Sequence, residues 1–142
     1  VVGYQDADTR QAAYEARVQT YRDKRKSEEE AARLAATIQP AANANEHGTG
    51  YAADILSADD PQQDTSFAET RAYEWLAAYA AEYGFILRYP KEAESVTGIT
   101  YEPWHWRYVG AENAALLNQS GLCLEDAVAV LQRIAAGETV TG

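Results

Sequence analysis

In the first part of the chain, apolar positions recur with the spacing of a helix. From Asp8, which is positioned to act as a cap, apolar and aromatic side chains recur every three or four residues to about Lys24. Ser27 and Glu30 then have the spacing of a capping box, and the acidic residues 28–30 suit the first turn of a helix. Two helices are therefore predicted at the start of the chain.

The pattern changes after the second predicted helix. Residues 39–50 include a proline, two asparagines and two glycines, which indicates a loop, and residues 51–56 are typical of a short strand. Residues 57–65 are polar and predicted to be exposed. A third helix is expected over residues 66–83, with Gly84 as its stop signal. Its predicted apolar stripe consists of Trp75, Leu76, Tyr79 and Tyr83.

Strands and short helices are predicted in the second half of the chain. Residues 85–88 predict a strand, and residues 97–108 predict extended chain that is broken at Pro103. Two short helices follow at residues 111–118 and 124–136. Helices at both ends with strands between them predict an α+β fold, in which a small antiparallel sheet is flanked by helices.

Composition excludes several classes of protein. A chain of 142 residues, 46% of them hydrophobic, suits one globular domain over residues 1–142, and no apolar run approaches the roughly 20 residues of a transmembrane helix. Twelve Lys+Arg against 22 Asp+Glu give a formal charge of −10, which opposes nucleic-acid binding. The single cysteine, Cys123, excludes an internal disulfide and a four-cysteine zinc site.

Three residues have the side chains of a metal site. The chain contains only two histidines: His47 opens a glycine-rich stretch that ends at Asp54, and His105 lies between two tryptophans. A hydrolytic zinc ion needs about three imidazole or carboxylate ligands, and His47, Asp54 and His105 supply that number. Asp54 also falls within a predicted strand, where a carboxylate is costly unless it is paired or bound to a cation.

Glu102 is a candidate general base. It precedes His105 by three residues, so a regular strand would turn the two side chains to opposite faces. Pro103 breaks that regularity and allows both to reach one pocket. A glutamate there accepts a proton from water and passes it to a leaving amine. Taken singly, each of these residues also has a structural interpretation: a core histidine, a turn residue or a strand-end cap.

Four segments of the chain are similar to the sequences of a known family. They are residues 46–54, which follow a Ser-X-His-X-X-Gly-X-Ala-X-Asp pattern, Trp75-Leu76, residues 84–90 and residues 97–110. On these segments the chain resembles the zinc-dependent D-alanyl-D-alanine carboxypeptidases of the VanY type, whose fold is shared with D-Ala-D-Ala dipeptidases and the hedgehog domain. By position, the resemblance implies that His47, Asp54 and His105 bind Zn²⁺ and that Glu102 is the catalytic base.

The substrate pocket departs from the family's pattern. Gln5 stands where the family has a pocket arginine, Arg10 where it has a glutamine, and Asn45 where it has a serine. One hypothesis is that Arg10 replaces the missing arginine in holding the substrate carboxylate or the developing oxyanion. The alternative is that Arg10 is a surface residue. Arg88 is a further candidate for contact with the substrate.

The resemblance implies removal of the terminal D-alanine from a peptidoglycan stem peptide. The same chemistry would also suit an L,D bond, a free dipeptide or a peptidoglycan crosslink. A non-catalytic zinc-containing module that binds the cell wall and a structural domain without metal are the alternative classes. The family role implies a location outside the cytoplasmic membrane. Because the sequence starts at Val1 and contains no methionine, an export signal or anchor is expected in a segment upstream.

Overall fold

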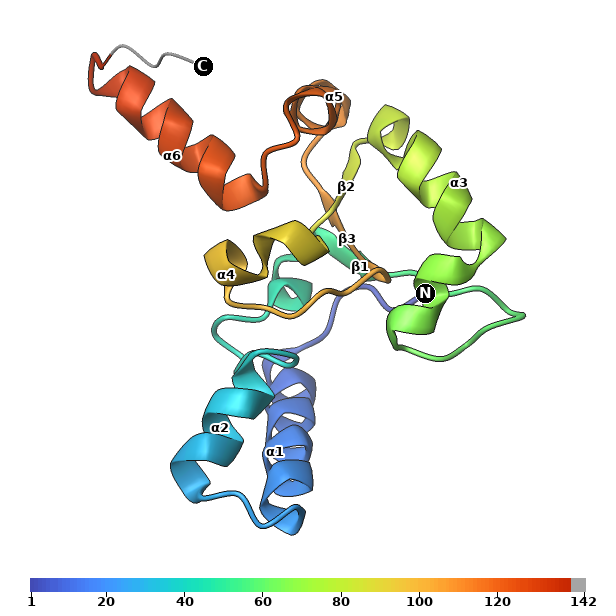
Figure 1. The fold of residues 1–142 in the computed structure, drawn as a ribbon, viewed down its shortest axis with the longest axis vertical. Helices are drawn as coiled ribbons and strands as arrows, with labels where there is room; N and C mark the ends of the chain where they lie inside the picture. Colours follow the sequence, from blue (N-terminus) through green and yellow to red (C-terminus); the bar gives the residue numbers. More distant parts are fainter. Residues whose placement is uncertain (139–142) are drawn as a thin grey trace.

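Three short strands form an antiparallel sheet at the centre of the molecule (Figure 1). In this computed structural model, which describes residues 1–138, the strands are β1 (Ala52–Asp54), β2 (Phe85–Leu87) and β3 (His105–Tyr108). Their order is β1-β3-β2, so β3 pairs with both neighbours. The small antiparallel sheet predicted from the sequence is confirmed.

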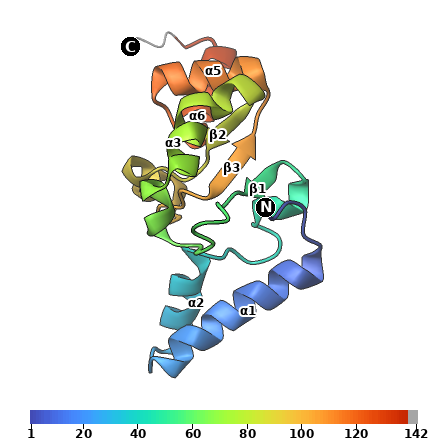
Figure 2. The ribbon, with the colours of Figure 1, turned by 90° about the vertical axis from the view of Figure 1, so that its right-hand side faces the viewer.

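Helices surround this sheet. They are α1 (Ala7–Asp23), α2 (Glu28–Ala36), α3 (Arg71–Tyr79), α4 (Glu94–Thr97), α5 (Ala111–Ser120) and α6 (Leu124–Ala135). Figure 1 and Figure 2 show α1 and α2 as a hairpin that extends away from the sheet, with α5 and α6 at the opposite end. Within residues 1–138 no single helix is long and apolar enough to cross a membrane, although α5 and α6 together, bent by 99° at their junction, meet the length and composition for one.

Side-chain caps define the starts of the first two helices. Asp6 caps α1, where its carboxylate accepts a hydrogen bond from the Thr9 backbone N–H at 2.7 Å, so the predicted cap at Asp8 was wrong by two residues. The Ser27 hydroxyl oxygen accepts from the Glu30 N–H at 3.2 Å, which confirms the predicted start of α2. The two helices enclose a small buried cluster of Val18, Ala31 and Ala35.

The third predicted helix consists of three consecutive pieces. A 3₁₀ helix, η2 (Thr65–Glu69), precedes α3, and a second one, η3 (Ala80–Tyr83), follows it. Thr70 separates η2 from α3 and caps α3 through its hydroxyl oxygen. The predicted stop is confirmed, because Gly84 adopts the left-handed backbone conformation with φ +86°.

The predicted apolar stripe of α3 was largely wrong. Leu76 is buried, but the other members are exposed: Trp75 by 49%, Tyr79 by 46% and Tyr83 by 61%. Their rings contact one another on the surface, with centroids 5.4 and 5.8 Å from that of Trp75. The helix face toward the sheet consists of Ala72, Tyr73, Leu76 and Ala80. The three exposed aromatic residues thus pack against one another on the surface, while a different face of the helix packs on the core.

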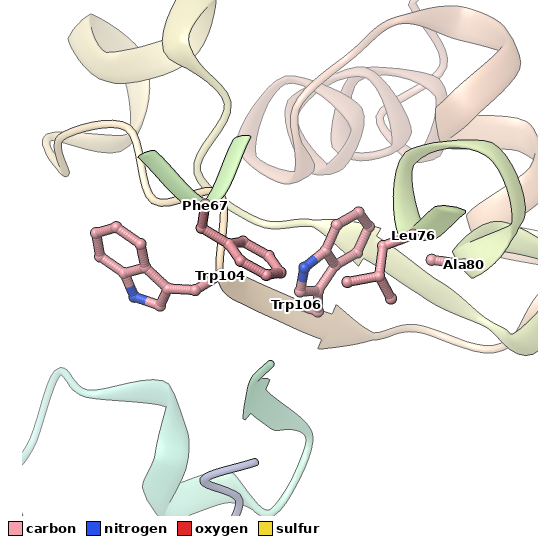
Figure 3. Close-up of a cluster of buried hydrophobic side chains, with 5 residues drawn as sticks. All are labelled: Phe67, Leu76, Ala80, Trp104 and Trp106. Atoms are coloured by element: carbon pink, nitrogen blue, oxygen red, sulfur yellow. The ribbon is translucent and has the colours of Figure 1, made fainter. Parts of the chain in front are cut away.

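The main core lies between α3, η2 and the sheet. Its buried side chains are Phe67, Leu76, Ala80, Trp104 and Trp106 (Figure 3). The Trp106 indole N–H donates to the Pro103 carbonyl at 3.1 Å, so its polar group is satisfied. His105, one residue before Trp106 on β3, faces the opposite side of the sheet because side chains alternate along a strand. The alternation separates the apolar core from the polar site described next.

Candidate metal centre

Three elements bring His47, Asp54 and His105 together. His47 lies on a short 3₁₀ helix, η1 (Glu46–Thr49), within the predicted loop, whereas Asp54 ends β1 and His105 begins β3. The pairing of β1 with β3 places Asp54 directly opposite His105. One ligand atom from each of the three buried residues lies within 4.8 Å of the others, which is close enough for all three to hold one metal ion.

The N-terminal residues orient the His47 ring. A backbone bridge between Val2 and Asp54 brings Gly3 beside η1. The Gly3 carbonyl oxygen lies 2.8 Å from His47 Nδ1, and His47 Nε2 lies 3.2 Å from Asp54 Oδ1. Donation of the Nδ1 proton to the carbonyl leaves the Nε2 lone pair directed at the site, which is the arrangement that metal-binding histidines use.

The two oxygens of the Asp54 carboxylate have different surroundings. Its Oδ2 accepts a hydrogen bond from the Gln63 side-chain amide at 2.8 Å. Its Oδ1 lies 3.0 Å from His105 Nδ1, is buried, and accepts no hydrogen bond from residues 1–138. A buried carboxylate oxygen beside two imidazole nitrogens fits a divalent cation, which would relieve the cost of burying its charge.

Glu46 supports His105 from outside the ligand set. Glu46 Oε2 lies 3.5 Å from His105 Nε2, and Glu46 Oε1 accepts from Arg88 Nε at 2.8 Å. Burial alone would raise the pKa of Glu46, but His105 and Arg88 outweigh it and lower the pKa to about 2. A permanently ionised carboxylate behind a ligating histidine orients the ring and makes it a better ligand. This role was not predicted, although Glu46 directly precedes His47.

The turn from Glu102 to His105 places the candidate base beside the ligands. The His105 N–H donates to the Glu102 carbonyl at 3.1 Å, with Pro103 at the second position of the turn, where its fixed φ is favoured. Glu102 Oε2 lies 3.7 Å from His105 Nδ1, and the residue is 5% exposed. Burial raises the pKa of Glu102 to about 8. The prediction that Pro103 brings both side chains to one pocket is confirmed.

A cavity of about 350 Å³ opens onto these residues. Its lining includes His47, Asp54, Glu102 and His105, and it also includes Asn45. The Asn45 side chain accepts a hydrogen bond from the His47 N–H at 3.0 Å and thereby caps η1. The structure therefore brings the three candidate ligands, the candidate base and one predicted pocket residue to a single site.

The residue pattern matches a characterised family over most of the chain. The family model described as VanY, D-alanyl-D-alanine carboxypeptidase, matches residues 1–111. The chain belongs to the VanY family. A D-alanyl-D-alanine carboxypeptidase of Enterococcus faecalis is 35% identical over 124 residues, which are 87% of this chain and 44% of that protein. The chain thus spans less than half the length of this VanY relative.

Solved structures of VanY-like peptidases share the fold. A variant of the vancomycin-resistance D,D-pentapeptidase VanY, in complex with Zn(II), matches with a TM-score of 0.77 and 32% identity over 89% of this chain and 68% of that one. The LD-carboxypeptidase LdcB matches with a TM-score of 0.74 and 33% identity over 87% of this chain and 54% of that one. The first of these proteins is named for a D,D bond and the second for an L,D bond, so relatives that cut different bonds share this fold.

Two of the predicted substrate-pocket residues lie outside the cavity of about 350 Å³. Gln5 and Arg10 are absent from its lining. Arg10 Nε donates to the Ala42 carbonyl at 3.0 Å, and its Nη1 donates to the Gln5 carbonyl. The guanidinium thereby ties the start of α1 to the loop before His47 and lies against Gly48. The structure therefore does not support Arg10 as the replacement for the family's pocket arginine, because backbone carbonyls occupy its donors.

Arg88 also lies outside the lining of the cavity. Its Nε donates to Glu46, while its Nη1 and Nη2 donate to the two carboxylate oxygens of Glu125 at 2.9 and 2.6 Å. Arg107 Nη1 also reaches Glu46, at 3.3 Å. All three guanidinium nitrogens of Arg88 thus donate hydrogen bonds to carboxylates, and 8% of the residue is exposed. Arg88 therefore links structural elements and does not face the site.

Gly48→Ala is expected to lower the free energy of unfolding by about 1–2 kcal/mol. A Cβ at Gly48 would overlap the Arg10 guanidinium, which is the end of a flexible side chain and would move away. The cost is the loss of the two hydrogen bonds that Arg10 makes to carbonyl groups. Urea unfolding measures the change, and Gly3→Ala, where a Cβ meets nothing within 4 Å, is the matched control.

A double-mutant cycle tests the cause of this loss. In an Arg10→Ala background, Gly48→Ala should change the unfolding free energy by less than about 0.5 kcal/mol, because the clash and the hydrogen bonds are both gone. An equal loss in the presence and absence of Arg10 would show that the contact with the guanidinium is not responsible.

Proposed function

We propose that this protein is a zinc carboxypeptidase that removes the terminal D-alanine from peptidoglycan stem peptides. The observation that carries the proposal is the buried group of His47, Asp54 and His105 with Glu102 in the same cavity. Membership in the VanY family and the zinc complex of a VanY relative support the choice of reaction and metal. The proposed site of action is peptidoglycan outside the cytoplasmic membrane.

The proposed ligands suit zinc. Two imidazoles and one carboxylate are a ligand set of hydrolytic zinc sites, which keep a further position open. Asp54 Oδ1, which accepts no hydrogen bond within residues 1–138, is the oxygen best placed to bind the ion with His47 and His105. Bound zinc supplies Lewis acidity, which polarises the scissile carbonyl and makes water a better nucleophile.

Glu102 is proposed to move the proton during hydrolysis. Its carboxylate takes a proton from the attacking water as the oxygen bonds to the carbonyl carbon, and gives it to the amine of D-alanine as the C–N bond breaks. The burial that raises the pKa of Glu102 to about 8 makes the ionised carboxylate a stronger base than it is in water. Glu46 and Gln63 act on the ligands, the first behind His105 and the second on Asp54 Oδ2.

Release of D-alanine from a pentapeptide that ends in D-Ala-D-Ala tests the proposal. We expect release with zinc, loss of activity with a chelator, and recovery when zinc is restored. Elemental analysis of the wild-type protein should give about one zinc per chain, and His47→Ala should lose it. No release by protein that retains its zinc would contradict the proposal and favour a binding module.

A substrate panel determines which bond is cut. It contains the pentapeptide, a tetrapeptide with a terminal L,D bond, free D-Ala-D-Ala and a crosslinked peptide dimer. The proposal predicts the highest kcat/KM for the pentapeptide. A preference for the tetrapeptide would place the chain with LD-carboxypeptidases such as LdcB, to which it is 33% identical.

A further inference from the structure

Arg17 lies at the cavity, on the face of α1 that also carries Arg10. The two arginines are seven residues apart, which is about two helical turns, so they project from the same side of α1. Arg10 extends beneath the loop before His47, whereas Arg17 contributes to the lining of the cavity. The sequence offered no reason to single out Arg17, because nothing in the helix distinguishes it from a solvated surface residue.

Arg17 is the cationic member of an otherwise acidic lining. No other lysine or arginine belongs to the lining residues found within 1–138. The lining carboxylates are Glu46, Asp54, Asp64, Glu94 and Glu102. An anionic ligand that enters this cavity therefore meets repulsion from several sides, and Arg17 offers the countercharge among the side chains described.

The donors of Arg17 are available for a ligand. The side chain is exposed, and in the described part of the chain the ion pairs of arginine and lysine do not include it. Arg17 and the candidate base Glu102 line the same cavity. The guanidinium is thus available to a ligand in the cavity that also contains the candidate base.

The other arginines near the site do not line the cavity, and each contacts a protein group. Arg10 binds two backbone carbonyls, Arg88 binds Glu46 and Glu125, and Arg107 pairs with Glu46. Gln5, which stands where the VanY family has its pocket arginine, does not line the cavity. Within residues 1–138 these contacts leave Arg17 as the arginine that can meet a carboxylate inside the cavity.

We propose that Arg17 binds the terminal carboxylate of the substrate and so makes the enzyme selective for a free C-terminus. The proposal rests on the carboxypeptidase function proposed above. A guanidinium matches a carboxylate through two parallel hydrogen bonds, whereas a terminal amide offers neither the negative charge nor the second acceptor. Arg17 is therefore a specificity-determining residue, and the proton transfer remains with Glu102.

Two peptides that differ only at their C-terminus test the role of Arg17. The zinc enzyme is assayed with the pentapeptide acid and with its C-terminal carboxamide. Arg17→Ala should raise KM for the acid about tenfold or more, with a smaller effect on kcat, and should leave the kinetics for the amide nearly unchanged. Arg17→Lys should recover part of the loss, because an ammonium keeps the charge without the planar geometry.

The control is Arg33→Ala on α2, which removes an exposed arginine outside the cavity lining and should leave the preference for the acid unchanged. If Arg17→Ala retains the full preference of the wild type for the acid over the amide, the proposal is overturned while the carboxypeptidase function stands. If the wild type cleaves neither peptide, the proposed function fails instead.

Binding measured without turnover then decides the role of Arg17 by itself. Calorimetric titration with the pentapeptide acid at low temperature compares zinc-loaded Glu102→Gln with the zinc-loaded double variant Glu102→Gln/Arg17→Ala, in which the loss of the base prevents cleavage. Weaker binding of the acid, by about tenfold, in the protein lacking Arg17 supports the proposal. Equal affinities overturn it.

Discussion

Glu102→Gln is expected to reduce kcat for D-alanine release by about 100- to 10,000-fold, which is the usual contribution of a positioned general base. Glutamine has almost the same shape as glutamate but cannot accept the proton of the attacking water. Glu102 is buried and comes from a turn whose hydrogen bond uses only its backbone carbonyl. The substitution therefore removes the proton acceptor without removing a contact that holds the turn.

Retention of zinc separates this effect from damage to the site. Glu102 is not one of the three candidate ligands, so Glu102→Gln should bind zinc in the same amount as the wild type and unfold at nearly the same temperature. Glu112→Gln, which changes an exposed glutamate on α5, is the matched control and should keep full activity. More than a tenth of wild-type kcat in zinc-loaded Glu102→Gln would remove Glu102 from the role of base.

The parts of this site that the sequence predicted correctly depend on local backbone geometry. Pro103 between Glu102 and His105 indicates a break in the strand, and the break is a turn closed by one hydrogen bond of 3.1 Å. The proline, asparagines and glycines of residues 39–50 indicate a loop, and a short 3₁₀ helix over Glu46–Thr49 lies within it. In each case residues within about ten positions determine the conformation.

The parts that the sequence could not predict depend on distant partners. Glu46 and His105 are far apart in the chain, and only the assembled sheet places the carboxylate 3.5 Å from the imidazole. Arg10 and Arg17 look alike as exposed positions of one helix, yet the loop before His47 binds Arg10 and leaves Arg17 at the cavity. Spacing along a helix identifies a shared face but does not identify which tertiary neighbour each side chain meets.

The surface of α3 shows the same limit for apolar residues. The predicted stripe joined Trp75 and Tyr79 to Leu76 because these residues recur at helical spacing. Tyr73, Leu76 and two alanines face the sheet instead, where they pack against the cluster that contains Phe67 and Trp106. The volume available on one side of a helix depends on what the opposite layer contributes.

Arg88→Met is expected to lower the free energy of unfolding by about 3–5 kcal/mol at neutral pH. Arg88 connects the end of β2 to Glu46, beside η1, and to Glu125 on α6. Methionine has a similar length but no charge, so the mostly buried Glu46 would lose its closest cation while keeping its own charge. The loss is large because Glu46 keeps only the longer contact with Arg107, at 3.3 Å, while its charge stays mostly buried. Glu125 is more exposed and contributes less.

The pH dependence of this loss tests whether charge is its cause. Burial alone would raise the pKa of Glu46 and of Glu125 above the ordinary value of 4.5. The contacts with His105 and Arg88 outweigh burial and lower the pKa of Glu46 to about 2, and the hydrogen bonds with Arg88 lower the pKa of Glu125. A carboxylate with a lowered folded pKa stabilises the protein above about pH 4.5 and loses that contribution as pH falls through the folded pKa. Urea unfolding should therefore show the difference between wild type and Arg88→Met shrinking below pH 4.5. Arg71→Met, at an exposed position on α3, should match the wild type throughout, and a difference for Arg88→Met that does not change with pH would assign the loss to packing.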